Sequence, residues 1–120
     1  PPTDFLNFGG KPARPTRRPY LMFSEGIEGK TDEEIRARMA EISPARQVKE
    51  QRLPPLLLMH GTMDPLVPLQ QSEIMVEAMR EAGNTVELFV KEYGGHFWID
   101  LPLDLFKAVA WFDAHLANAK

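Results

Sequence analysis

The stretch that most constrains the fold is the apolar run from Leu56 to His60, which ends at Gly61. A short apolar run bounded by turn residues predicts a strand that is buried on both faces, as in a parallel sheet. The loop that follows, as far as Pro68, contains one acidic residue, Asp64. Because open α/β sheets place their chemistry at the carboxyl ends of their strands, Asp64 is the first candidate functional residue.

A helix and a second strand follow this loop. Residues 70–82 carry apolar side chains at helical spacing, with charged residues opposite, and Gly83 ends the pattern. Residues 85–92 alternate apolar and polar side chains, which predicts a strand. A strand, a helix and a strand in this order form a βαβ unit with parallel strands and a right-handed crossover. The loop after the second strand, which carries His96, should therefore emerge at the same edge of the sheet as Asp64.

The first part of the chain, residues 1–53, predicts a loop-rich cap or connector region with one short helix. That helix spans residues 31–42 and begins with a capping box, in which Thr31 and Glu34 bind each other's backbone amides. We expect Pro44 to end it, because the residue before a proline is pushed out of the helical region.

The last part of the chain, residues 54–120, predicts the βαβα portion of an α/β fold. Its final helix is expected over residues 104–117, with Asp104 as its cap. Four apolar side chains at helical spacing are expected to pack across the sheet: Leu105, Val109, Phe112 and Leu116.

Composition excludes several classes of function. The 120 residues carry a formal net charge of −3, so we expect neither nucleic acid nor an anionic membrane surface as a partner. No apolar run approaches the roughly 20 residues that span a bilayer. Cysteine is absent and the three histidines lack the paired spacing of a metal site, so we expect no thiolate chemistry, no metal and no cofactor.

Asp64 and His96 together form the candidate catalytic pair. A carboxylate and an imidazole at the carboxyl ends of neighbouring parallel strands make the orienting half of a nucleophilic triad. In that arrangement the aspartate holds the tautomer of the histidine, which takes the proton from a serine hydroxyl. The 32 positions between the two residues fit one loop, one helix and one strand.

Each of these residues also has a structural alternative. Asp64 could close a turn with the following proline, and His96 could be a hydrogen-bonded loop histidine. We interpret His60 as a structural residue at the strand end and His115 as a solvated residue of the last helix. Two later acids are the fallback candidates: Asp100 and Asp104.

The same loops resemble a known family. The segment from His60 to Pro68 (HGTMDPLVP), followed by a helix, a strand and Gly94-Gly95-His96, is similar to the C-terminal part of an α/β-hydrolase. It most resembles acetyl-esterase and feruloyl-esterase-like carboxylesterases, with dienelactone hydrolases and prolyl-oligopeptidase-type peptidases more distant. The resemblance implies that Asp64 is the triad acid, that His96 is the triad base and that the substrate is a small ester.

The nucleophile of that family lies in a G-x-S-x-G turn between a strand and a helix. None of Ser24, Ser43 and Ser72 has this setting. We therefore expect the chain to be a fragment, inert alone, whose partner is the missing N-terminal portion of the same hydrolase, which carries the nucleophile. Two alternatives stay open: a non-catalytic binding or assembly module on the same scaffold, and a serine peptidase of the prolyl-oligopeptidase type.

Overall fold

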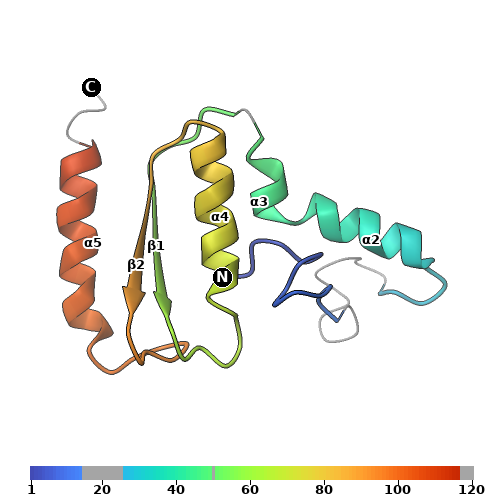
Figure 1. Ribbon diagram of the computed structural model, residues 1–120, viewed down its shortest axis with the longest axis horizontal. Coiled ribbons are helices and arrows are strands. Elements are labelled where there is room, and N and C mark those ends of the chain that lie inside the picture. The colour runs from blue at the N-terminus through green and yellow to red at the C-terminus, as the bar shows by residue number, and fades with distance from the viewer. Residues whose placement is uncertain (15–25, 50, 117–120) are drawn as a thin grey trace.

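The computed structural model describes residues 1–14, 26–49 and 51–116. The helices and strands in these ranges are α2 (Asp32–Glu41), α3 (Pro44–Gln47), β1 (Leu56–Gly61), α4 (Gln70–Glu81), β2 (Val86–Lys91) and α5 (Leu101–Leu116). Figure 1 shows the two strands side by side, with α5 and α4 on opposite sides of them and with α3 and α2 beyond α4. The chain is therefore a layered α/β structure, as its sequence predicts.

The sheet consists of β1 and β2, which pair in parallel from Leu56 opposite Val86 to Gly61 opposite Lys91. This pairing confirms both predicted strands and the parallel βαβ unit. Alternate residues of the strands face opposite helices, because successive side chains of a strand point to opposite faces. Both loops at the carboxyl ends of the strands lie at the same edge of the sheet (Figure 1).

The crossover helix α4 confirms the helix expected over residues 70–82. Val76 and Met79 are buried on its inner face. The helix ends at Glu81, and Gly83, two residues beyond it, has a positive φ of 73°. The amide of Gly83 donates to the carbonyl of Arg80 and the amide of Asn84 donates to that of Met79. This paired arrangement satisfies the last carbonyls of the helix and returns the chain to β2.

The N-terminal residues contain no helix or strand within 1–14, and they are held against α4 by hydrogen bonds. The amides of Thr3 and Asp4 both donate to Gln71 Oε1 at 2.9 Å. The amide of Phe5 donates to the hydroxyl of Ser43 at 2.9 Å. Because Gln71 and Ser43 are fully buried, this segment fastens the region around α3 to the crossover helix.

Helix α2 confirms the predicted capping box and α3 corrects the predicted connector. The Thr31 hydroxyl accepts from the Glu34 amide at 3.2 Å, and the Glu34 carboxylate accepts from the Thr31 amide at 2.7 Å. The sequence predicts only that Pro44 ends this helix. In the structure Pro44 also begins α3, because a proline at the first helical position lacks only an amide that would have no partner.

The final helix begins earlier than predicted, at Leu101 rather than at Asp104. Asp104 is not a cap, so that prediction is wrong. Its carboxylate lies in the first turn, where Oδ2 accepts from Lys91 Nζ at 3.0 Å and from Trp98 Nε1 at 2.9 Å. Its Oδ1 accepts from Lys107 Nζ at 2.8 Å. The carboxylate thus joins the end of β2, the following loop and α5.

The buried face of α5 also differs from the prediction. Trp111 is buried and lines a small hollow together with Lys107 and Ala108 of the same helix and Leu57, Met59, Glu87 and Phe89 of the strands. The predicted apolar stripe is exposed: Leu105 by 48%, Val109 by 57% and Phe112 by 48%. The side chain of Leu116 lies outside the described residues. The ion pairs of Asp104 explain the difference. Asp104, Lys107 and Trp111 share one face of α5, and the ion pairs of Asp104 turn this face toward the sheet.

Candidate active site

The two loops at the carboxyl ends of the strands are joined by their backbones. The amide of Thr62 donates to the carbonyl of Lys91 at 3.0 Å, and that of Met63 donates to the carbonyl of Gly94 at 2.8 Å. In return, the amide of Tyr93 donates to the Thr62 hydroxyl at 2.9 Å. These bonds fix the first loop relative to the second without involving the side chains of Asp64 and His96.

Gly61 allows this close approach. A Cβ atom at position 61 would lie 2.2 Å from the carbonyl oxygen of Gly94 and 2.4 Å from that of Gly95. Both distances are far inside van der Waals contact, and the Gly94 oxygen already accepts from the Met63 amide. Only glycine therefore fits where the first loop leaves β1.

Asp64 lies in the first loop with its side chain only 6% exposed. Its Oδ1 accepts from the amide of Leu66 at 2.8 Å and from that of Val67 at 2.9 Å. Its Oδ2 lies 2.8 Å from His96 Nδ1. Burial acts to raise the pKa of Asp64, but the hydrogen bonds from Val67, His96 and Leu66 outweigh it and hold that pKa below its ordinary value. The carboxylate is therefore a fixed anionic acceptor for the imidazole.

His96 lies in the second loop with its side chain 37% exposed. Since a carboxylate oxygen faces Nδ1, this nitrogen carries the proton and Nε2 presents a lone pair. Nε2 has no hydrogen-bond partner within the described ranges. The ring edge is supported by Phe97, whose centroid lies 5.1 Å away at an interplanar angle of 89°. The structure thus brings the two candidate residues together with the basic nitrogen directed away from the acid.

His60 lies behind the acid and is only 3% exposed. Its Nδ1 is 2.6 Å from the Ser72 hydroxyl, and its Nε2 is 2.9 Å from the Val67 carbonyl oxygen and 3.5 Å from Asp64 Oδ2. The sequence interpretation of His60 as a structural residue did not foresee this contact with the acid. The signal was available, because a residue four positions before Asp64, across a tight turn, lies within reach of it.

The fallback acids bind elsewhere. Asp100 Oδ2 and Asp104 Oδ2 lie 2.5 and 3.0 Å from Lys91 Nζ. Hydrogen bonds from Lys107 and Lys91 hold the pKa of Asp104 far below its ordinary range. Neither acid has a hydrogen bond with His96 in the part of the chain that the structure describes, so Asp64 is the acid that faces this imidazole.

The remaining histidine and the serines also have defined positions. His115 is partly exposed and stacks on Trp111 with ring centroids 4.0 Å apart, a contact that its interpretation as a solvated residue did not include. Ser43 and Ser72 are fully buried, and their hydroxyls bind the Met39 carbonyl and His60. Ser24 lies outside the described residues. Neither described serine presents a hydroxyl to His96.

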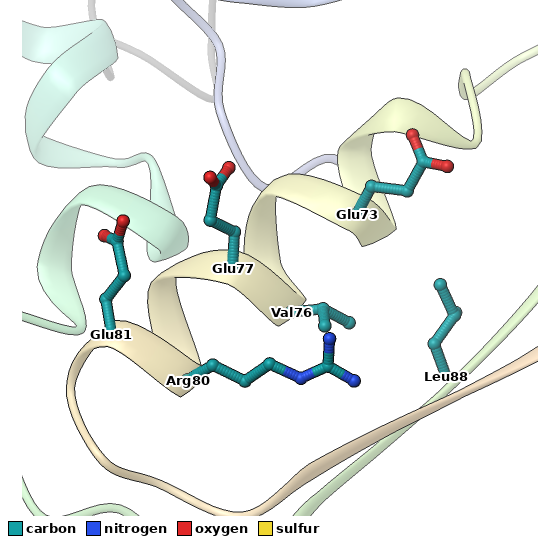
Figure 2. A pocket seen from close by; sticks show the side chains of 6 residues that line it. All are labelled: Glu73, Val76, Glu77, Arg80, Glu81 and Leu88. Carbon is teal, nitrogen blue, oxygen red and sulfur yellow. The ribbon is translucent and has the colours of Figure 1, made fainter.

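A second hollow lies on the α4 side of the sheet, opposite the hollow at α5, and it does not include Asp64 or His96. It lies between α4 and β2 and is lined by Glu73, Val76, Glu77, Arg80, Glu81 and Leu88. Figure 2 shows Val76 and Arg80 extending from α4 toward Leu88. Over residues 1–14, 26–49 and 51–116, no cluster of side chains suits a metal ion and no helix is long and apolar enough to span a bilayer.

The fold and the paired loops define the class of protein. Two parallel strands, a crossover helix and a C-terminal helix form the C-terminal part of an α/β-hydrolase fold. The sequence model of the prolyl oligopeptidase family matches residues 13–119. The chain belongs to the prolyl oligopeptidase family.

Solved structures of esterases resemble the chain. An esterase of Thermogutta terrifontis, Est2, is 28% identical with a TM-score of 0.60, over 73% of this chain and 37% of that one. Its propionate-bound form is 29% identical with a TM-score of 0.58, over 82% and 39%. A truncated carbohydrate esterase from gut microbiota has a TM-score of 0.63 at 24% identity, over 79% and 32%, and supports the fold alone. No curated protein matches the sequence. The chain spans well under half the length of these esterases.

Proposed function

We propose that this chain supplies the acid and the base of a Ser-His-Asp triad in a serine ester hydrolase. The observation that carries the proposal is the 2.8 Å contact between Asp64 Oδ2 and His96 Nδ1 at the carboxyl ends of two parallel strands. The acid is buried and the base is partly exposed, as general-base catalysis on an incoming substrate requires.

The proposed mechanism uses the two nitrogens of His96 in different ways. Nε2 takes the proton of a serine hydroxyl as its oxygen attacks the ester carbonyl, and Asp64 stabilises the imidazolium that forms. The imidazolium then protonates the departing alcohol, which leaves an acyl-enzyme. Water, activated by the same Nε2, hydrolyses that acyl-enzyme and restores the serine.

We place the nucleophile in an upstream portion of the same hydrolase, outside this chain. The two described serines are buried, and the esterases that the chain resembles are much longer. The shape of the chain also supports a missing partner. Its radius of gyration is 16.3 Å, whereas a compact domain of this length would have about 13.6 Å.

The exposed stripe of α5 is the surface that we propose this upstream portion covers. Phe106 is 71% exposed and lies beside Leu105, Val109 and Phe112, which are also exposed. Contiguous apolar side chains of this size mark an interaction surface. Phe106→Asp should weaken binding of a separately produced upstream portion, and Ala37→Asp on the exposed face of α2 should not. Equal binding of both variants would refute this placement.

A short-chain carboxylic ester is the substrate that we propose. Two of the similar structures are forms of the Thermogutta esterase bound to propionate and to butyrate, which are short carboxylic acids. The same esterase is also described as phosphorylated by paraoxon. An organophosphate of this kind reacts with activated nucleophiles, as the proposed mechanism requires of its serine.

Labelling with a fluorophosphonate probe and hydrolysis of p-nitrophenyl butyrate test the proposal. The longer protein should react with both, the 120-residue chain alone should react with neither, and His96→Ala in the longer protein should slow hydrolysis by at least about 10³-fold. If the longer protein is not labelled, the chain is instead part of a non-catalytic module. Hydrolysis by the His96→Ala variant near the wild-type rate would refute the role of His96.

A serine peptidase is the second candidate, and the match to the prolyl oligopeptidase family favours it. Ester and peptide hydrolysis share the triad, so the site alone does not separate them. Comparing kcat/KM for p-nitrophenyl butyrate and for a short proline-containing peptide does. A larger value for the ester supports the esterase, and a larger value for the peptide supports the peptidase.

A further inference from the structure

A series of hydrogen bonds, buried at its inner end, leads from α4 to the candidate acid. It begins at the Ser72 hydroxyl in α4, which lies 2.6 Å from His60 Nδ1. His60 Nε2 then lies 2.9 Å from the Val67 carbonyl oxygen, and the Val67 amide donates to Asp64 Oδ1 at 2.9 Å. The other oxygen of Asp64 meets His96. The series therefore connects the first turn of the crossover helix with the candidate base.

The hydrogen-bond partners determine the tautomer of His60. Both groups near Nε2, the Val67 carbonyl and the Asp64 carboxylate, can only accept, so in the neutral ring Nε2 carries the proton. Nδ1 then presents a lone pair, and the Ser72 hydroxyl donates to it. The opposite tautomer would place a lone pair against two oxygens in a buried site, which is costly.

We propose that His60 is a positioning residue for the acid and that Ser72 holds it in the required tautomer. The proposal rests on the proposed roles of Asp64 and His96. His60 Nε2 binds the Val67 carbonyl oxygen, and the amide of the same residue donates to Oδ1. His60 Nε2 also lies 3.5 Å from Oδ2. These contacts leave the carboxylate one orientation, in which Oδ2 is directed at His96.

Ser72, His60 and Asp64 do not form a second triad. Ser72 and His60 are 0% and 3% exposed and the side chain of Asp64 is 6% exposed, so no ester carbonyl can reach the Ser72 hydroxyl. This series orients the acid but does not itself react with a substrate.

Substitutions at position 60 separate this role from simple packing. Leucine fills the space but donates no hydrogen bond, whereas glutamine places an amide nitrogen near the former Nε2 and keeps a donor for Val67. In protein labelled with ¹⁵N at histidine, His60→Leu should weaken the Nδ1-protonated signature of His96. It should also raise the pKa of Asp64 toward its ordinary value of 3.8. His60→Gln should restore both.

A matched pair of serine substitutions covers the case in which His60→Leu does not fold. Ser72→Ala removes the donor to Nδ1, so His60 should become a mixture of tautomers and the His96 signature should broaden. Ser43→Ala is the control, because Ser43 is equally buried but binds Met39 and Phe5 instead.

In the ester hydrolysis assay, His60→Leu should lower kcat about 10- to 100-fold with KM nearly unchanged, because a misplaced acid affects the base and not the substrate. Unchanged His96 signals in folded His60→Leu or in Ser72→Ala would overturn the role of position 60. So would failure of His60→Gln to restore those signals. The spectra do not depend on turnover. If the longer protein does not hydrolyse esters, the proposed function is refuted, but the spectra still test the role of His60.

Discussion

Replacing Asp64 with asparagine exchanges one carboxylate oxygen of the candidate site for an NH₂ group. The asparagine oxygen should occupy the place of Oδ1, because that position accepts from the amides of Leu66 and Val67 at 2.8 and 2.9 Å. The NH₂ group must then lie where Oδ2 was, 2.8 Å from His96 Nδ1 and 3.5 Å from His60 Nε2. It would face two ring nitrogens that are protonated in the wild-type chain.

His96 can relieve this conflict by moving its proton to Nε2. Nδ1 then accepts from the asparagine amide, but Nε2 can no longer take the proton of a serine. From the corresponding substitution in serine proteases, we expect turnover to fall about 10⁴-fold. That loss equals about 5 kcal/mol of transition-state stabilisation.

The assay is kcat for p-nitrophenyl butyrate hydrolysis by the longer protein, with the His96 tautomer followed by ¹⁵N spectra. Asp100→Asn is the matched control, because Asp100 lies in the same region and binds Lys91 at 2.5 Å, with its side chain 45% exposed. It should leave turnover close to wild type. A folded Asp64→Asn variant that retains turnover within about tenfold of wild type would refute the assignment of Asp64 as the acid.

Three further predictions concern stability. Because the pKa of folded Asp64 lies below 3.8, its ionised form stabilises the chain above that pH and the contribution disappears as pH falls through the folded pKa. The difference between the urea midpoints of wild type and Asp64→Asn should therefore be constant around neutral pH and should shrink only below pH 3.8. A difference that already shrinks at mildly acidic pH would contradict this. Gly61→Ala should destabilise the chain by about 1 to 3 kcal/mol or more in urea unfolding, because its Cβ would overlap the Gly94 carbonyl. Asp104→Asn should lower the urea midpoint more than Asp100→Asn, since three donors meet Asp104; equal midpoints would contradict that ranking.

The sheet, the crossover helix and the pairing of the two loops were predictable because they follow from local patterns. The apolar run at 56–60, the helical spacing at 70–82 and the alternation at 85–92 each describe one element. The parallel pairing then follows from connection rules that hold for almost all such units. The meeting of Asp64 and His96 required only that both follow strands of one sheet.

The errors occurred where a contact between distant residues decides the local structure. Asp104 looks like a helix cap in the sequence, but its carboxylate binds Lys91 of the preceding strand, which turns a different face of α5 toward the sheet. Pro44 ends one helix as predicted and also begins another, which the pattern of the first helix cannot show. The contact of His60 with the acid depends on the tight turn between them.

The joined backbones of the two loops have a consequence for how proteins of this fold can diverge. The spacing of the acid and the imidazole is set by amide-to-carbonyl bonds and by Gly61, none of which depends on the exposed side chains around them. Met63 and Tyr93 are 64% and 76% exposed on the same loops. A combinatorial library at these two positions would alter what an incoming molecule touches while the contact between Asp64 and His96 beneath stays the same. The contacts offered at this rim can thus diverge independently of the pairing of Asp64 with His96.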